Sequence, residues 1–237
     1  MKQHVKLTKK EEIANGTMAF HFEKPAELVF RAGQFCDITL INPSETDAEG
    51  NVRGFSLANA PFQNDIIVAT RMRDTAFKRV LKDMPIGSEV VFDGPYGDFT
   101  LHKNQATEAV FLIGGIGVTP VLSMVAQATH DKTDHKMLLL HSSRSPKDLP
   151  FRNDLEALAA KNPNFSYVPV ASDEADQEWQ GERGKIDVAM VKKYTSKLQA
   201  PKYYLSGPEA MVKAMRTLLI SIGVDEDTIR SEEFSGY

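Results

Sequence analysis

Residues 109–120, AVFLIGGIGVTP, limit most strongly what this chain can fold into. The apolar run 109–113 predicts a strand buried on both faces, as in a parallel sheet. A glycine-rich turn follows at once. Thr119, a plausible cap, and Pro120, near the first helical position, then open an apolar pattern that predicts an amphipathic helix. The order strand, turn, helix is therefore expected at this point of the chain.

The turn itself contains Gly114, Gly115 and Gly117, and glycines let the backbone approach a ligand closely. The free N–H groups and the dipole of the helix that follows favour negative charge. The turn therefore suits an anion such as a phosphate, although a tight turn without a ligand would explain the same residues. Its spacing is not G-x-G-x-x-G, so a standard Rossmann site is not predicted.

The amino-acid composition limits the classes of protein to which this chain can belong. The 237 residues suffice for one large domain or two of ordinary size, and the net charge of −4 argues against a nucleic-acid-binding protein. The single cysteine, Cys36, excludes a disulfide framework and a four-cysteine cluster within the chain. The histidines show no metal spacing, so we expect no metal site. The polar N-terminus has no signal-peptide pattern, and no apolar run approaches the ~18 residues of a membrane span, so we expect a cytoplasmic protein.

Short strands dominate the first hundred residues. Apolar and β-branched residues, separated by turn signals, predict strands at 17–23, 35–41, 66–71 and 89–93 and one helix near 75–82. This pattern predicts a small antiparallel barrel or sandwich.

Beyond residue 102 strands and helices alternate, which predicts a parallel sheet covered by crossover helices. Strands are expected at 109–113, 137–141, 165–170 and 202–205, and helices ending near 129, 161 and 222. We place the domain boundary in the polar stretch 103–107, which gives domains 1–104 and 105–237. Ligands of such sheets bind at the carboxyl ends of the strands, where the turns 114–120, 142–144 and 206–208 would line one crevice. This convergence favours nucleotide binding.

One short strand of the first half, RGFSL, combines a cation, an aromatic ring and a hydroxyl group. Alternation would place Arg53 and Phe55 on one face and Gly54 and Ser56 on the other. A cation for phosphate and an aromatic beside a ring suit a flavin nucleotide. An ordinary edge strand with a surface arginine would explain the same residues.

Four motifs follow one another along the chain: RGFSLAN (53–59), GPYGDF (94–99), GGIGVTP (114–120) and SGPEAM (206–211). Together they resemble the flavin motif, barrel-closing turn, nucleotide loop and C-G-P-x-x-M turn of the ferredoxin–NADP reductase family. The resemblance covers essentially the whole chain. It implies an N-terminal FAD-binding antiparallel β-barrel and a C-terminal NAD(P)-binding α/β domain with a parallel sheet, in a stand-alone reductase without a fused ferredoxin domain.

For the flavin, the resemblance implies that Arg53 meets the phosphates, Phe55 lies against the ring system and Ser56 lies near the hydride-accepting nitrogen. The family often has a glycine and a serine or threonine in its pyrophosphate turn, where this chain reads TAFK (75–78). FAD is favoured, and FMN is the less favoured alternative. The expected flavin site comprises Arg53, Gly54, Phe55, Ser56, Thr70, Arg71, Met72, Ala76, Phe77 and Lys78.

For the nicotinamide nucleotide, the resemblance implies a site made of Gly115, Gly117, Thr119, Pro120, Ser143, Arg144, Ser172, Asp173, Gly207, Pro208 and Met211. The acids of the stretch 173–176 would repel a 2′-phosphate, which favours NADH over NADPH, whereas Arg144 favours the opposite choice. Ser206 replaces the cysteine that lies beside the nicotinamide in the family. We expect hydride transfer to be retained, because the chemistry belongs mainly to the two cofactors.

The C-terminus resembles that of many family members, which end in an acid and an aromatic residue stacked on the flavin. Glu232 and Phe234 match this spacing, and Tyr237 is a second candidate for the aromatic. A frayed terminus is the alternative. The expected catalytic residues are Ser56, Ser206, Glu232 and Phe234.

The resemblance implies hydride transfer between NAD(P)H and bound FAD, followed by electron transfer to a separate redox protein such as a ferredoxin. Two alternatives stay open. One is a reductase of free flavin, in which the flavin is a substrate that leaves. The other is a flavin-bound electron-transfer or regulatory subunit with little turnover of its own.

Overall fold

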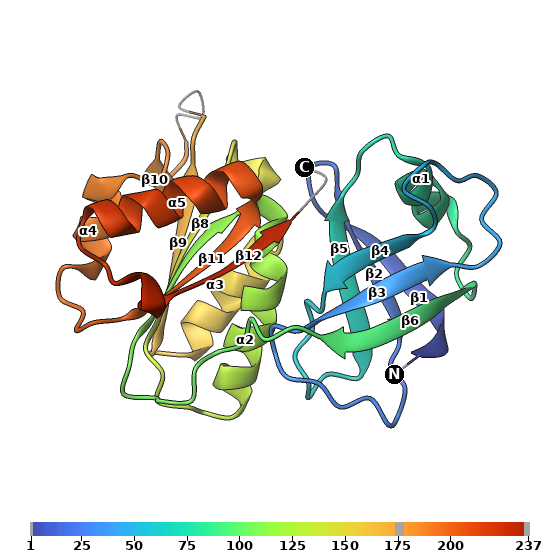
Figure 1. Cartoon of the computed structure of the whole chain (residues 1–237), viewed down its shortest axis with the longest axis horizontal. Helices are drawn as coiled ribbons and strands as arrows, with labels where there is room; N and C mark the ends of the chain where they lie inside the picture. Colours follow the sequence, from blue (N-terminus) through green and yellow to red (C-terminus); the bar gives the residue numbers. More distant parts are fainter. Residues whose placement is uncertain (1, 174–177, 235–237) are drawn as a thin grey trace.

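The computed structural model describes residues 2–173 and 178–234. Two six-stranded sheets lie side by side, one in each half of the molecule (Figure 1). This architecture confirms the predicted combination of an antiparallel β domain and a parallel α/β domain. The domain limits themselves stay a prediction. In the described part of the chain, no helix is long and apolar enough to cross a membrane.

The N-terminal sheet is antiparallel throughout, in the order β4-β3-β6-β1-β2-β5. Its end strands β4 and β5 contact each other, which curls the sheet into a barrel around an apolar core. The elements of this half are β1 (Lys2–Ala14), β2 (Thr17–Glu23), β3 (Phe35–Leu40), β4 (Val52–Ser56), β5 (Asp65–Arg71), α1 (Ala76–Asp83) and β6 (Glu89–Tyr96).

The C-terminal sheet is parallel, in the order β10-β9-β8-β7-β11-β12. Ala109, Phe111 and Ile113 of β7 pack on the side of α2 and α3, whereas Val110 and Leu112 pack on the side of α4 and α5. The run of apolar residues thus reflects burial on both faces. The elements are β7 (Ala109–Gly114), α2 (Val118–His130), β8 (Met137–Ser143), α3 (Arg152–Lys161), β9 (Phe165–Ala171), β10 (Glu182–Arg183), α4 (Val188–Thr195), β11 (Lys202–Pro208), α5 (Glu209–Ser221) and β12 (Ile229–Phe234), with 3-10 helices at Gly115–Gly117, Pro146–Asp148 and Glu226–Thr228.

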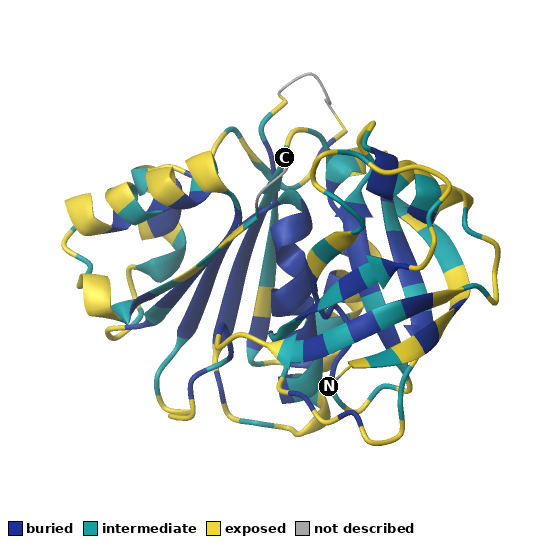
Figure 2. Cartoon of the chain, turned by 45° about the vertical axis from the view of Figure 1, so that its right-hand side comes forward, coloured by how far each residue is buried: buried dark blue, intermediate teal, exposed yellow. Residues whose placement is uncertain are grey.

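Helix α2 differs from the amphipathic helix expected from the sequence. It lies between the two sheets and is buried on nearly all sides along its first two turns (Figure 2). The expected cap is also wrong, because Gly117 occupies the N-cap position and Thr119 lies inside the helix. The Thr119 hydroxyl instead donates a hydrogen bond to the carbonyl of Ile116 (3.1 Å).

Strands β1 and β12 and helix α4 were not predicted. β1 is a central strand, but only Val5 and Leu7 of its thirteen residues are buried, so its polar sequence carries little strand signal. β12 pairs in parallel with β11 and forms an edge of the second sheet. This pairing brings the end of the described chain back to the barrel.

Candidate functional site

Two cavities meet where the barrel joins the α/β sheet. The β4–β5 cavity, of about 370 Å³, is lined by Phe35, Arg53, Gly54, Phe55, Ser56, Ala69, Thr70, Arg71, Lys78, Ile116, Glu232, Glu233 and Phe234. The glycine-turn cavity, of about 330 Å³, is lined by Asn15, Thr17, Arg71, Arg73, Gly114, Gly115, Ile116, Ser142, Ser143, Arg144, Asp148, Pro150, Pro208 and Met211. Arg71 and Ile116 line both cavities, so the two adjoin.

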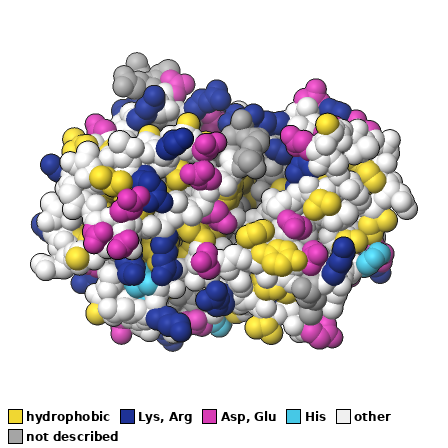
Figure 3. Space-filling model, in the orientation of Figure 1, with side chains coloured by type: hydrophobic (Ala, Val, Ile, Leu, Met, Phe, Trp, Pro, Cys, Tyr) yellow, Lys and Arg dark blue, Asp and Glu magenta, His cyan; other side chains and the backbone are white. Residues whose placement is uncertain are grey.

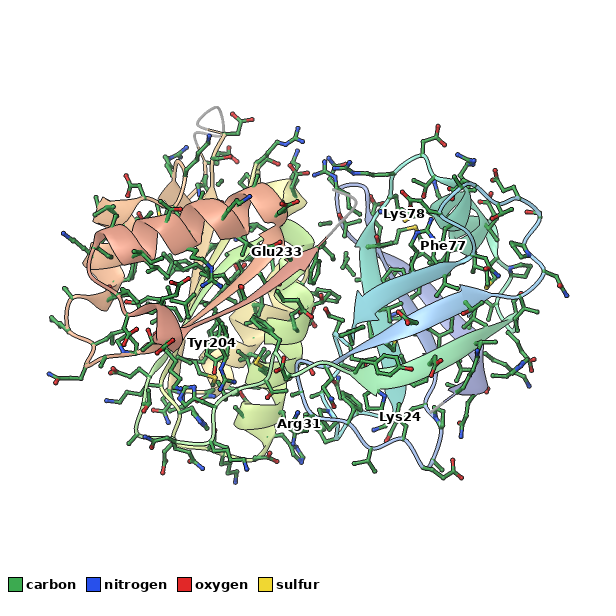
Figure 4. All side chains as sticks on the ribbon, in the orientation of Figure 1. Lys24, Arg31, Phe77, Lys78, Tyr204 and Glu233 are labelled. Carbon is green, nitrogen blue, oxygen red and sulfur yellow. The ribbon has the colours of Figure 1, made fainter. Side chains whose placement is uncertain are left out.

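The β4–β5 cavity collects most of the residues expected around the flavin, together with two expected at the C-terminus, Glu232 and Phe234. Lys78 and Glu233 approach it from opposite halves of the molecule (Figure 4). Sequence reasoning missed Phe35, Ala69, Ile116 and Glu233. Ile116 lies inside the glycine-rich turn, which could have signalled it, whereas Phe35 carries no distinguishing pattern.

Ser56 of β4 and Glu232 of β12 connect the two halves across this cavity. Burial raises the pKa of Glu232 to about 7, a hydrogen bond from Ser56 opposes this rise, and the carboxylate of Asp98 adds to it. One carboxyl oxygen of Glu232, Oε2, is buried without a hydrogen-bond partner among the described residues. Glu232 therefore exchanges a proton close to neutral pH beside the Ser56 hydroxyl group.

Cations gather at the α1 end of the cavity. Lys78 donates a hydrogen bond to the carbonyl of Arg71 (2.9 Å). Burial, and after it repulsion by Arg73 and Arg53, lowers the pKa of Lys78, whereas the carboxylate of Glu49 opposes this shift. Cationic side chains such as Lys78 can stabilise a bound phosphate.

The loop between β3 and β4 holds the guanidinium of Arg53. This group donates to the carbonyls of Glu49 (3.0 Å) and Gly50 (3.1 Å) and contacts the carboxylates of Glu49 (2.9 Å) and Asp47 (3.4 Å). The other oxygen of Asp47 accepts a hydrogen bond from the backbone N–H of Ala76 (3.1 Å). Sequence reasoning missed Asp47, because nothing distinguishes it from the other polar residues of its loop.

Helix α1 begins beside the cavity. The hydroxyl oxygen of Thr75, its N-cap residue, is buried and has no hydrogen-bond partner among the described residues. Ala76 and Phe77 are buried, and the Phe77 ring lies 5.9 Å from that of Phe55 in the barrel core. Neither Ala76 nor Phe77 lines the β4–β5 or the glycine-turn cavity, and Met72 packs against the same core. The backbone N–H groups, rather than these side chains, are what this turn offers a ligand.

The glycine-turn cavity collects Gly115, Ser143, Arg144, Pro208 and Met211 from the nucleotide site expected from the sequence. The structure adds Asn15, Thr17 and Arg73 from the barrel. Arg73 follows Arg71 by two residues, and this R-x-R spacing was the available signal.

Several expected nucleotide residues lie behind the cavity wall. Thr119, Pro120, Ser206 and Gly207 are buried. Gly117 is also buried, and a Cβ atom there would lie 2.5 Å from the carbonyl oxygen of Ser206. Gly117 thus allows the turn to pack against β11. The side chain of Ser206 has no hydrogen-bond partner among the described residues.

The stretch after β9 is only partly described. The backbone N–H of Ser172 donates to the carbonyl of Ser143 (3.0 Å), and that of Asp173 donates to the carbonyl of Arg144 (2.6 Å). Neither Ser172 nor Asp173 lines the glycine-turn cavity. Two further acids of the expected NADH determinant, in the range 174–177, and the second aromatic candidate, Tyr237, lie outside the described residues.

His141 supports the glycine turn from β8. Its Nε2 atom lies 2.9 Å from the carbonyl oxygen of Gly115, and its Nδ1 atom lies 3.3 Å from the Tyr167 hydroxyl. Burial lowers the pKa of His141 to about 4, although the hydrogen bond to the Gly115 carbonyl acts in the opposite direction and raises it. The ring is therefore neutral at physiological pH and holds the turn as a hydrogen-bonding group.

Comparisons with known proteins agree with this geometry. Residues 111–217 match the family model of the oxidoreductase NAD-binding domain. The reductase component of phenol 2-monooxygenase from Pseudomonas sp. (strain CF600) is 31% identical over 218 residues, which cover 90% of this chain and 60% of that protein. The glycine betaine monooxygenase reductase subunit of Chromohalobacter salexigens is 29% identical over 223 residues, with 92% and 60% covered. The chain thus spans about 60% of the length of these relatives.

A solved structure matches almost the whole chain. The ferredoxin NADP+ reductase of Neisseria gonorrhoeae, crystallised with bound FAD and NADP, superposes with a TM-score of 0.81 and 22% identity over 98% of both chains. This likeness establishes the same two-domain fold. The sequence matches make the chain similar to the reductase components of monooxygenases, and residues 111–217 similar to the oxidoreductase NAD-binding domain.

Proposed function

We propose that this chain binds FAD in the β4–β5 cavity, accepts hydride from NAD(P)H in the glycine-turn cavity, and passes electrons to a separate redox protein. The observation that carries the proposal is that the two cavities adjoin and share Arg71 and Ile116. Hydride transfer needs two rings held face to face at close distance, which is a positioning effect. Adjoining cavities at a domain junction supply this arrangement.

The chemistry of the β4–β5 cavity fits a flavin nucleotide. Arg53 and Lys78 offer positive charge, and the start of α1 offers backbone N–H groups, which suit the phosphates of FAD. Thr75 Oγ1 and Glu232 Oε2 are buried polar atoms without partners among the described residues, so a polar ligand would satisfy them. We assign the phosphate end to Arg53, Thr75 and Lys78 and the ring end to Ser56, Glu232 and Phe234.

FAD, when bound, accepts a hydride and releases its electrons singly. The protein supplies orientation and proton control. Ser56 donates a hydrogen bond to Glu232, whose raised pKa lets its carboxyl group hold a proton near neutral pH. Phe234 lines the cavity from β12 and would limit access of water to the ring end.

The electron acceptor is proposed from the relatives, which are named as reductase components of monooxygenases. We infer that the acceptor is an oxygenase, a ferredoxin or a similar redox protein. A cytoplasmic location stays a prediction.

One observation favours a second candidate, a reductase of free flavin. The Asp47 carboxylate occupies both Arg53 and the Ala76 N–H, two of the groups that would bind flavin phosphates. Such internal competition would weaken flavin retention and favour exchange of the bound flavin with free flavin.

The test is anaerobic titration of the flavin-loaded protein with NADH, with absorbance followed near the flavin maximum. Stoichiometric FAD in the purified protein and bleaching by one equivalent of NADH support the first proposal. Bleaching only in the presence of excess flavin, with a colourless purified protein, supports the free-flavin reductase. A protein that takes up neither FAD nor FMN contradicts both proposals.

Arg53→Ala should weaken flavin retention by about 1.5–3 kcal/mol, because it removes a charge-assisted phosphate contact.

A further inference from the structure

Three arginines line the glycine-turn cavity, and they come from both halves of the molecule. Arg71 is the last residue of β5, Arg73 follows it by two residues, and Arg144 follows β8. Among the residues that the structure describes, their guanidinium groups form no hydrogen bond or ion pair. Lys and Arg side chains also gather along the upper rim of the groove between the two halves (Figure 3).

The single acid among the described lining residues does not neutralise this charge. Asp148 accepts hydrogen bonds from the neutral groups of Asn15 (3.2 Å) and Ser145 (3.0 Å), and its single negative charge is outnumbered by the three arginines. In a chain with a net charge of −4, three guanidinium groups without a partner among the described residues are a local excess of positive charge around one cavity. A dianionic ligand would relieve their mutual repulsion.

The barrel reaches into this cavity through the β1–β2 hairpin. The backbone N–H of Asn15 donates to the carbonyl of Lys147 (2.9 Å), and the carbonyl of Gly16 accepts from the N–H of Met72 (2.8 Å). The hairpin thus connects the segment that carries Arg71 and Arg73 to the turn after β8. The arginines therefore hold their places relative to the glycine turn.

We propose that Arg73, with Arg144, is a binding residue for the diphosphate of the dinucleotide, and that it acts from the opposite domain. The proposal rests on the function proposed above. The cavity adjoins the β4–β5 cavity and includes Gly114 and Gly115, which is where a diphosphate would lie if the nicotinamide reached the flavin. Asp173, in the loop expected to meet the adenosine ribose, does not line it, so the 2′-phosphate is the less favoured ligand.

The experiment measures equilibrium binding of ADP-ribose, NAD+ and NADP+ to the FAD-loaded protein by calorimetry. Arg73→Gln should weaken all three by about ten-fold, since each carries the diphosphate and a charge-assisted contact is lost. Flavin content should stay unchanged. Arg152→Gln is the matched control, because Arg152 is an arginine of the α/β domain that already pairs with Glu156 (2.7 Å).

The outcomes separate this inference from the function on which it rests. If the loaded wild-type protein binds no dinucleotide, the proposed function fails. If the wild type binds NAD+ and Arg73→Gln leaves all affinities unchanged, the arginine assignment fails. If Arg73→Gln weakens only the binding of NADP+, Arg73 contacts the 2′-phosphate and the diphosphate assignment is overturned. If the variant loses flavin while its affinities for the three nucleotides stay unchanged, Arg73 contacts the flavin phosphates instead.

Discussion

The carboxylate of Asp47 accepts a hydrogen bond from the backbone N–H of Ala76, the first residue of helix α1 (3.1 Å). An anion at this position, next to the Arg53 guanidinium, has the same recognition chemistry as a phosphate. The loop that carries Asp47 therefore competes with the nucleotide end of a flavin for the same groups.

Replacing this internal anion should tighten flavin binding. We expect Asp47→Asn to lower the dissociation constant for FAD about three- to ten-fold, because a neutral amide binds Arg53 less strongly than a carboxylate does. Fluorescence titration of the flavin-free protein measures the effect. Glu49→Gln is the comparison, since Glu49 contacts Arg53 whereas the Ala76 N–H donates to Asp47. Equal affinities for the wild type and Asp47→Asn would show that the loop does not compete.

The pKa of Glu232 predicts how stability changes with pH. Because the folded-state pKa of about 7 is above the ordinary glutamate value of 4.5, the folded state binds the proton more tightly, and stability falls as pH rises from about 4.5 to 7. Glu232→Gln removes this titration. The variant should therefore gain on the order of 2–3 kcal/mol relative to wild type between pH 4.5 and 8. Urea unfolding of flavin-free protein across this range measures the difference, and parallel pH profiles for both proteins would contradict the shifted pKa.

Gly117 tests whether the glycine turn is shaped by packing. Gly117→Ala places a Cβ atom 2.5 Å from the Ser206 carbonyl oxygen and 2.6 Å from the Gly207 nitrogen. We expect a loss of about 1–3 kcal/mol in the free energy of unfolding, as for overpacked cores. Gly54→Ala is the control, because the added Cβ atom would lie 3.4 Å from a side-chain oxygen of Asp37, which is an ordinary contact distance. Unchanged stability with weaker NADH binding would instead make Gly117 a ligand-contacting residue.

Periodicity and composition predicted much of this fold, because its strands are either alternating or apolar throughout. They failed where a strand's burial is one-sided and sparse, as in β1, with Val5 and Leu7 as its only buried residues. They also failed for α2, since the pattern of one helix does not reveal that a second domain covers its outer face.

Only part of the candidate site could be predicted from the sequence. Arg53, Ser56 and Glu232 carry motif signals, and the fold brings them to one cavity. Asp47 and Asn15 carry none, because their positions depend on how loops far apart in sequence meet. The packing role of Gly117 is likewise visible only once β11 lies against the turn.

Coenzyme choice depends on the loop after β9. Asp173 is exposed there, and its backbone N–H is bonded to the carbonyl of Arg144. A carboxylate near the 2′-phosphate of NADPH costs about 1 kcal/mol or more at a partly exposed site, and salt reduces this cost. We therefore expect NADH to be preferred about ten-fold in kcat/KM.

Asp173→Arg should shift this preference toward NADPH while leaving kcat with NADH nearly unchanged, because the substituted side chain lies outside both cavities. Steady-state kinetics with both coenzymes at two salt concentrations measures the shift, and an electrostatic origin requires it to shrink at high salt. Asp131→Arg, at the end of α2, is the control for added charge alone. Equal or better turnover of the wild type with NADPH, lost on Arg144→Ala, would place the 2′-phosphate against Arg144 and reverse the coenzyme assignment.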